Sequence, residues 1–480
     1  MIIFPELVLI VFAVALILID AFSKEASYEV IGKGAMLGVF FAFLATFTFP
    51  AGSSFQWAEL YAVDPLALFF KRFFLVTVFI VLAMSFSQAG KLVLGASESF
   101  ILPLFTTTGM MLLASAVDFM TIFVALELVT ISFYVLVALR RHETKSLEAG
   151  VKYLIIGALS TGFLVYGIAF VFGIAGTTKL SGLSYYLVVS PPSFGLLLAM
   201  VLVLSGIAFK LASVPFHVWA PDVYQGAPTP VTAFLSVGSK AAGIVVLLRV
   251  FFFAGFSNDA LDPYLIPVLS IMAAASALLG NFAAMTQRNL KRMLGYSSIG
   301  HAGYLLMALS CVNERGIQAV LVYLVIYLLS TLLAFFVIAQ HEDDIGGVDF
   351  KAYFGLAQRS PLLAFGMLVS FVSLAGIPPL AGFLGKLGVF AALWEIGNYS
   401  LLLVAIISAI AGLYYYLGVV RAMYWNQPNP DALPISLNGG SKFLVSVLAC
   451  LIIVLGVWQI PLQKAVEPVI GPNSIILSEK

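Results

Sequence analysis

Apolar runs recur from the first residues of the chain almost to the last, separated by short polar turns. Each run is roughly 20 residues long, the length of a helix that crosses the hydrocarbon core of a bilayer. No soluble domain fits between them, so the pattern indicates an all-α integral membrane protein. It predicts about fourteen transmembrane helices, at residues 2–20, 31–49, 66–86, 99–117, 119–139, 152–174, 194–222, 231–254, 263–284, 294–311, 317–339, 361–392, 399–424 and 441–460.

Composition supports lipid as the solvent, because 62% of the 480 residues are hydrophobic and only 10% are charged. The net charge of +1 gives no indication of nucleic acid or an acidic substrate. The run from Ile2 to Ile19 contains Glu6 and has no basic leader, so we interpret it as a retained first span. Cys311 and Cys450 lie far apart in apolar stretches and predict neither a disulfide framework nor a thiolate metal site.

The basic residues in the loops and near the ends of the spans predict the orientation of the chain. One side of the membrane receives Lys24, Lys33, Lys91, Arg140, Arg141, Lys145, Arg288, Lys291, Arg292, Lys351, Arg359, Arg421 and Lys442. The other side receives Lys71, Arg72, Lys179, Arg249, Arg315, Lys464 and Lys480. Since the richer side is expected to be cytoplasmic, both termini are predicted on the periplasmic side of a cell inner membrane.

Four lysines remain inside the predicted spans, and they are the main functional signal: Lys152, Lys210, Lys240 and Lys386. A charge near the bilayer centre costs about 2.5–3.5 kcal/mol on insertion scales. Glu127 joins them as a carboxylate near the middle of the fifth span. A carboxylate and lysines in one interior can pair, and pairing changes how tightly each holds a proton.

Each of these residues has a structural alternative. Lys152 could extend to the inner interface, beside other basic residues. Glu127 could be a protonated packing group. Lys386 could be held by the exposed backbone of a nearby helix break. Lys210 and Lys240 lie too far from a span end to reach water easily, so for them a proton path is favoured over a structural role.

Proline interrupts two of the spans, which are overlong. Pro215 should break the seventh span, and transporters place such breaks at ion sites. His217 would lie about 10 Å from Lys210 on one face of an unbroken helix, either as a proton relay or as a hydrogen-bonded packing residue. A string similar to Leu211–Pro215 recurs at Leu374–Pro378, in the twelfth span.

The recurring string predicts two homologous halves. Because the two spans are an odd number of steps apart, the halves should be inverted relative to one another. We therefore expect an N-terminal segment of helices at 1–98, a first five-helix repeat at 99–255, a second, inverted repeat at 256–424, and a last helix with a C-terminal tail at 425–480.

Several stretches carry a resemblance to a known family. They are Lys210–Phe216 followed by His217-Val-Trp-Ala-Pro-Asp-Val-Tyr-Gln-Gly-Ala-Pro-Thr-Pro230, Lys152–Ala158, Asn289–His301 and Gly376–Lys386. The chain resembles the antiporter-like subunits of respiratory complex I, and more narrowly subunit N of proton-pumping NADH:quinone oxidoreductase. The resemblance covers nearly the whole chain.

The resemblance implies a role for each candidate residue. Glu127 resembles the family's fifth-span glutamate, which pairs with a seventh-span lysine at Lys210. Lys240 resembles the eighth-span lysine of a central hydrophilic axis, and Lys386 the twelfth-span lysine that faces the outer exit. His217 resembles a relay position between lysines. Lys152 also matches a family lysine.

The chain has no cysteine run for an iron–sulfur cluster, no glycine-rich nucleotide loop and no convincing pair of haem histidines. We therefore expect no cofactor or metal in this chain. The resemblance places NADH, FMN, iron–sulfur clusters and quinone in partner subunits of the membrane-bound complex. Three alternatives stay open: a multi-subunit sodium/proton antiporter, a membrane hydrogenase or related complex, and a structural subunit that transports nothing.

Overall fold

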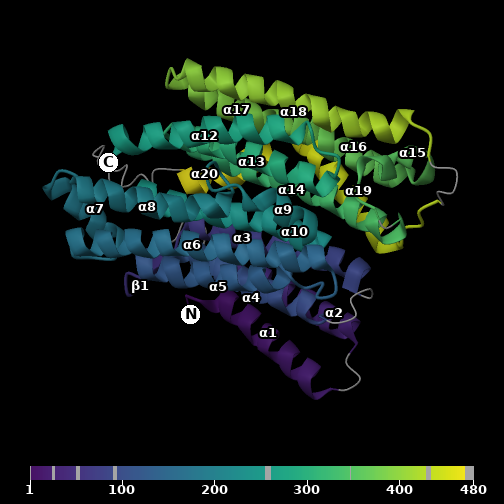
Figure 1. Ribbon diagram of the computed structural model, residues 1–480. Coiled ribbons are helices and arrows are strands. Elements are labelled where there is room, and N and C mark those ends of the chain that lie inside the picture. Colours follow the sequence, from purple (N-terminus) through teal and green to yellow (C-terminus); the bar gives the residue numbers. More distant parts are fainter. Residues whose placement is uncertain are drawn as a thin grey trace. The chain divides into compact units, whose positions relative to one another are not determined.

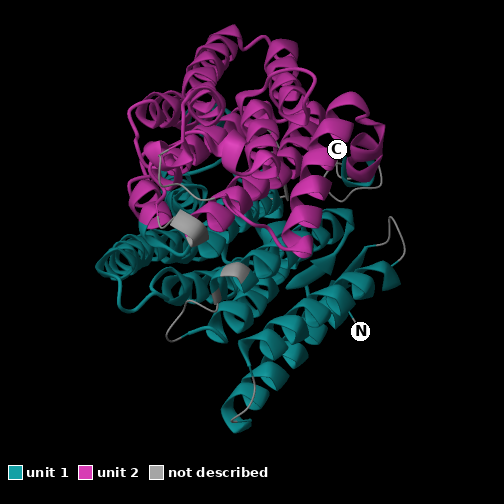
Figure 2. Ribbon diagram, turned by 90° about the vertical axis from the view of Figure 1, so that its right-hand side faces the viewer, with its two compact units in different colours: residues 1–212, 226–268, 467–480 teal, residues 213–225, 269–466 magenta. Residues whose placement is uncertain are grey.

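The structure is a computed structural model that describes residues 2–23, 27–49, 54–89, 95–253, 261–345, 347–428 and 434–470. Helices account for most of these residues (Figure 1). The chain divides into two compact units (Figure 2). Unit 1 comprises residues 1–212, 226–268 and 467–480, and unit 2 comprises residues 213–225 and 269–466.

Unit 1 is built on long apolar helices, with a small β-hairpin between the second and third. Helices α3, α4 and α5 pack in sequence, and α8 packs against α6 and α11. The elements are α1 (Phe4–Phe22), α2 (Tyr28–Ala45), η1 (Thr46–Thr48), β1 (Phe55–Trp57), β2 (Tyr61–Val63), α3 (Pro65–Ala89), α4 (Glu98–Ser115), α5 (Phe119–Val137), α6 (Thr144–Ala175), α7 (Leu180–Val189), α8 (Phe194–Leu211), α10 (Thr229–Phe234), η2 (Leu235–Ser239), α11 (Lys240–Leu247) and η3 (Leu248–Phe253).

Unit 2 is centred on α14, which packs against α13, α16, α17 and α19. Its elements are most of α9 (Trp219–Gly226) and of α12 (Asp262–Ala284), then α13 (Leu290–Leu309), α14 (Glu314–Ile345), η5 (Phe350–Tyr353), α15 (Leu356–Arg359), α16 (Pro361–Ala375), α17 (Ala381–Glu395), α18 (Tyr399–Trp425), α19 (Gly439–Val457) and the start of α20 (Ile460–Ile470).

The local sequence explains where the helices that carry the candidate residues begin. Asp118 caps α5, because its side chain accepts hydrogen bonds from the backbone N–H groups of Met120 and Thr121 at 2.8 and 3.2 Å. Asn289 caps α13 in the same way, by accepting from the N–H of Arg292 at 3.0 Å. These caps fix the register of the polar residues that follow.

The all-helical membrane fold is confirmed. Among the described residues, twelve helices are long and apolar enough to cross a membrane. Every predicted span overlaps one of these helices, α13, or the pair α16 and α17. The sixth span was placed too late, because α6 begins at Thr144. Lys152 therefore lies in the third turn of the helix and does not open it.

The two overlong spans are interrupted in the structure. Helix α8 ends at Leu211, because Ala212 adopts a left-handed conformation with φ 54° and the chain stays non-helical until Trp219. Helix α16 ends at Ala375, Gly376 is left-handed with φ 83°, and α17 begins at Ala381. Each interruption leaves the last carbonyl groups of a helix without an intrahelical partner.

Candidate functional site

Lys210 lies in the last turn of α8, with 4% of its surface exposed. Its ammonium donates a hydrogen bond to the hydroxyl of Thr130 on α5. That hydroxyl in turn donates to the carbonyl of Leu126, one turn earlier on α5, at 2.6 Å. The lysine is thus held inside unit 1 by a neutral partner.

Glu127 lies on the same helix, one turn before Thr130. It is half-buried, and its Oε1 accepts a hydrogen bond from the hydroxyl of Thr161 on α6 at 2.7 Å. The carboxylate is close enough to Lys210 for the two charges to interact. Within the described residues, however, no ion pair of 4.0 Å or less joins Glu127 to Lys210. The direct pairing implied by the resemblance stays a prediction.

Lys240 begins α11, directly after the π-helical turn η2, and is 1% exposed. Its ammonium donates to the carbonyl of Leu211, the last residue of α8, at 2.6 Å. Beside it, the hydroxyl of Ser239 donates to the carbonyl of Lys210 at 3.3 Å. The interrupted helix α8 therefore presents its negative end to a cation, which compensates the free carbonyl groups.

Lys386 repeats this arrangement in unit 2. It lies on α17, is 5% exposed, and donates to the carbonyl of Ala375, the last residue of α16, at 2.8 Å. Polar side chains lie on one side of it, because its ammonium and the Oδ1 of Asn281 both lie within 4.0 Å of the position that a Cβ on Gly412 would take. Asn281 donates to the hydroxyl of Ser408 at 2.7 Å and accepts from the hydroxyl of Tyr415 at 2.9 Å. In both units, then, a buried lysine occupies the end of a helix that stops before a proline.

A second polar cluster in unit 2 surrounds His301, the last residue of the family-like stretch Asn289–His301, to which the sequence assigned no role. Its Nδ1 lies 2.6 Å from the hydroxyl of Tyr323, and its Nε2 lies 3.1 Å from the hydroxyl of Tyr416. Tyr416 also contacts the hydroxyl of Ser297. The sequence could have indicated this cluster, because Ser297 and His301 are four residues apart and share one face of the predicted tenth span.

The other two candidates differ from the buried lysines. Lys152 pairs with Glu148 on α6 at 2.7 Å, and its side chain is 41% exposed. His217 lies after the interruption of α8, in a non-helical turn, so the argument that it shares a helix face with Lys210 does not hold. Its Nδ1 is buried and has no hydrogen-bond partner among the described residues.

Unit 1 also buries two basic residues, Lys71 and Arg249, that were counted for the orientation of the chain. Lys71 pairs with Glu6 at 2.9 Å, and both side chains are fully buried. The hydroxyl of Tyr61 donates to Glu6 and accepts from Lys71, each at 2.7 Å. Burial, together with the Glu6 carboxylate, holds the pKa of the Tyr61 hydroxyl well above its usual range.

Arg249 is the second such charge. Its guanidinium donates to both carboxylate oxygens of Asp64, at 2.5 and 2.8 Å, and to the carbonyl of Ala114. Lys71 and Arg249 thus lie inside the protein and do not count as loop charges, which weakens the side-to-side comparison of basic residues. Lys24, Lys91 and Lys480, which entered the same comparison, lie outside the described residues.

The part of the chain that the structure describes contains no group of three or more His, Cys, Asp or Glu residues able to hold a metal ion. The polar sites are instead built from lysine, hydroxyl and backbone carbonyl groups. Such groups can bind and release protons or order water, and they offer no redox centre.

This architecture is similar to that of a known family of membrane proteins. Residues 116–411 match the family described as NADH:quinone oxidoreductase/Mrp antiporter, TM. The NADH-quinone oxidoreductase subunit N of Desulforamulus reducens is 38% identical over 459 residues, which are 96% of this chain and 95% of that protein. A chain of respiratory complex I from Thermus thermophilus with bound aureothin is 33% identical with a TM-score of 0.82, over 97% of this chain and 99% of that one. A chain of the Mrp complex from Dietzia sp. DQ12-45-1b, 19% identical with a TM-score of 0.87 over 98% of this chain and 99% of that one, shows the same fold alone.

Long apolar helices, two of them interrupted, with lysines on the free helix ends, define an antiporter-like membrane protein. By the identity and coverage of its relatives, the chain belongs to the NADH-quinone oxidoreductase subunit N family. The resemblance drawn from the sequence is thereby confirmed over nearly the whole chain.

Proposed function

We propose that this chain is a proton-translocating subunit in the membrane arm of an NADH:quinone oxidoreductase. The observation that carries the proposal is the burial of Lys210, Lys240 and Lys386 in apolar helices, where no carboxylate of the described residues is in hydrogen-bond contact with them. Each ammonium costs about 2.5–3.5 kcal/mol near the bilayer centre. That cost is compensated if each lysine takes up and releases a proton in turn.

The residues of unit 1 supply the first steps. Glu127 and Thr130 lie on α5, and a movement of that carboxylate toward or away from Lys210 changes how tightly the lysine holds its proton. The ammonium of Lys240 donates to the carbonyl of Leu211, the residue that follows Lys210, so the two lysines are anchored at adjoining places in unit 1 and a proton passes between them in this proposal. Water is the expected carrier between them.

The residues of unit 2 supply the later steps. Lys386 is the proposed acceptor on the way to the outer face, and the ring of His301 offers two nitrogens in contact with tyrosine hydroxyls. His217 is a proposed relay and Lys152 a proposed entry residue at the inner interface. We further propose the two inverted repeats at 99–255 and 256–424, with both termini on the periplasmic side of the inner membrane.

The driving energy comes from other subunits in this proposal. NADH, FMN, iron–sulfur clusters and quinone would be bound by partner subunits, and the chain itself would hold none of them. A neighbouring antiporter-like subunit and small membrane subunits are the expected partners within the bilayer. Coupling must therefore reach this chain through contacts between membrane subunits.

The test is to solubilise the complex gently, identify the subunits that accompany the chain, and measure proton uptake by membrane vesicles. We expect NADH to drive uptake without a requirement for sodium. Replacing Lys210 and Lys240 by alanine should abolish most of it, whereas Lys442→Ala, an exposed residue at the start of α19, should not. Sodium-dependent exchange would favour an antiporter complex, and normal uptake by the double variant would favour a structural subunit.

A further inference from the structure

A cavity in unit 2 combines basic, aromatic and apolar side chains at the ends of two membrane-spanning helices. It has a volume of about 860 Å³ and lies where α12 and α18 end. Arg288 and Arg421 line it together with Tyr414 and Trp425, and Leu417 is among its apolar residues. None of the described residues that line it is Asp or Glu.

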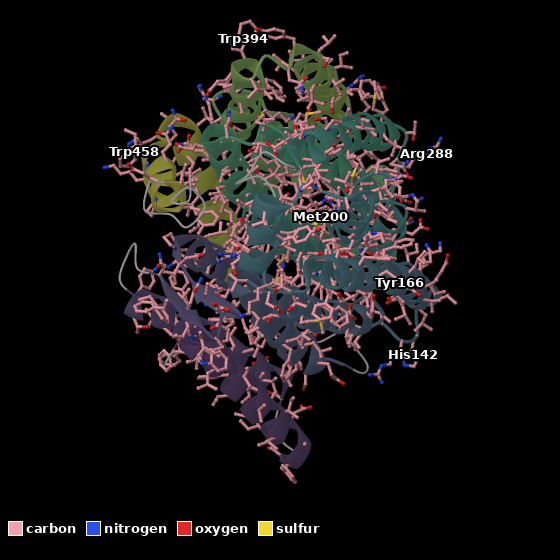
Figure 3. The ribbon with its side chains drawn as sticks, turned by 90° about the vertical axis from the view of Figure 1, so that its left-hand side faces the viewer. His142, Tyr166, Met200, Arg288, Trp394 and Trp458 are labelled. Atoms are coloured by element: carbon pink, nitrogen blue, oxygen red, sulfur yellow. The ribbon has the colours of Figure 1, made fainter. Side chains whose placement is uncertain are left out.

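The two arginines are unoccupied donors. Both are exposed, and neither guanidinium forms a hydrogen bond or ion pair with another described residue. Figure 3 shows the side chain of Arg288 extending beyond the ribbon. A planar guanidinium offers a fork of N–H donors that matches a phosphate oxygen pair. Two of them in one cavity therefore favour a phosphate group as ligand.

The electrostatic balance of the cavity supports an anion. The C-terminal ends of α12 and α18 each contribute a partial charge of about −0.5, which alone would repel it. Two guanidinium groups contribute +2, so the cavity keeps a net charge of about +1. The backbone around Arg288 is fixed, because its carbonyl accepts from the N–H of Phe350 at 2.9 Å.

The position of the cavity selects the kind of phosphate. Helix α18 runs from Tyr399 to Trp425, so Arg421 lies about 33 Å along its axis, at the depth of lipid headgroups. Trp425 is 75% exposed, as expected for an aromatic residue of the membrane interface, and Tyr414 is exposed about three turns deeper along α18. Leu417 is also exposed, so acyl chains can run along α18 below the headgroup.

From these observations we propose that the cavity binds the headgroup of an anionic phospholipid, with Arg288 and Arg421 on the phosphate and the acyl chains against α18. Basic pockets between transmembrane helices on the cytoplasmic side are suited to such headgroups. The proposal does not depend on proton translocation, because the arginines are separate from the buried lysines. It assigns this face of α18 to lipid and not to a neighbouring protein subunit.

Native mass spectrometry of the detergent-solubilised complex tests the site, with phosphatidylglycerol and cardiolipin as anionic probes and phosphatidylcholine as the neutral one. The variant Arg288→Gln/Arg421→Gln should bind the anionic lipids about thirtyfold more weakly, since each basic residue contributes about 1 kcal/mol to attraction by anionic lipid. Arg141→Gln/Lys145→Gln removes equal charge from exposed positions outside the cavity and should leave binding unchanged.

Two further experiments distinguish a bound lipid from a soluble phosphate and from a protein subunit. Glycerol 3-phosphate should compete poorly, and Trp425→Ala should weaken lipid binding but not binding of this soluble phosphate. A lipid with a photoreactive acyl chain should label α18 in the intact complex. The proposal is overturned if the two double variants bind alike, if glycerol 3-phosphate competes as well as lipid, or if α18 crosslinks to a protein subunit in place of lipid.

Discussion

The hydroxyl of Thr130 is the sharpest place to perturb the proposed pathway. Thr130→Val keeps the shape of the side chain and removes the acceptor that holds the ammonium of Lys210. A hydrogen bond to a charged group contributes about 1.5–3 kcal/mol, and more if the buried partner is left unsatisfied. This corresponds to a change of about ten- to hundredfold in the equilibrium between the ammonium and amine forms.

The assay is proton uptake by vesicles per NADH oxidised, measured for Thr130→Val, Thr130→Ser and Thr77→Val. The serine variant keeps the hydroxyl and should stay close to the wild type. Thr77 is the matched control, because it is fully buried and bonds to the carbonyl four residues earlier at 2.8 Å, without a lysine. If Thr130→Val and Thr77→Val pump equally, Thr130 does not set the protonation of Lys210 and the reasoning fails.

Three further changes have expected outcomes. Glu127→Gln keeps an acceptor for Thr161 and removes the charge, so pumping should fall while the complex assembles; unchanged pumping would exclude an electrostatic role. Arg249→Met should lower the free energy of unfolding in detergent by about 3–5 kcal/mol, because it leaves the charge of Asp64 buried without its ion-pair partner. The double variant Arg249→Met/Asp64→Leu should recover most of this loss. Asn281→Leu removes polar atoms beside Lys386 and should slow pumping; a wild-type rate would separate Asn281 from the path.

Sequence alone predicted the helices well because a bilayer dictates both their length and their apolar character. It also placed the interruptions near Pro215 and Pro378, since proline cannot continue the hydrogen-bond ladder. It missed β1 and β2, whose pairing depends on three residues each. It missed α7 as well, although Leu180, Leu183 and Leu187 follow a helical spacing and are buried.

The sequence predicted the residues of the candidate site less completely than it predicted the helices. Lys210, Lys240 and Lys386 could be singled out, because a lysine deep in an apolar run stands out by itself. Arg249 could not, since it lies near a span end and its partner Asp64 is 185 residues away in the sequence. No periodic pattern connects residues at that separation. The partners of Lys240 and Lys386 were also hidden, because backbone carbonyl groups carry no sequence signal.

His301 illustrates a third kind of limit. Its contacts with Tyr323 and Tyr416 come from three different helices, α13, α14 and α18. A histidine in a polar stretch of one span is consistent with packing, metal binding or proton transfer. The structure adds the two tyrosine hydroxyls, both within hydrogen-bond distance of the ring, as the groups that could exchange a proton with it.

The central claim is that buried lysines carry protons through this chain, and the number of protons moved per NADH oxidised tests it most directly. The measurement uses the purified complex in liposomes, with Lys240→Met compared with the wild type at matched assembly. We predict that the variant moves fewer protons for each NADH that it oxidises. An unchanged number of protons per NADH would contradict the account, because the ammonium of Lys240 would then be dispensable.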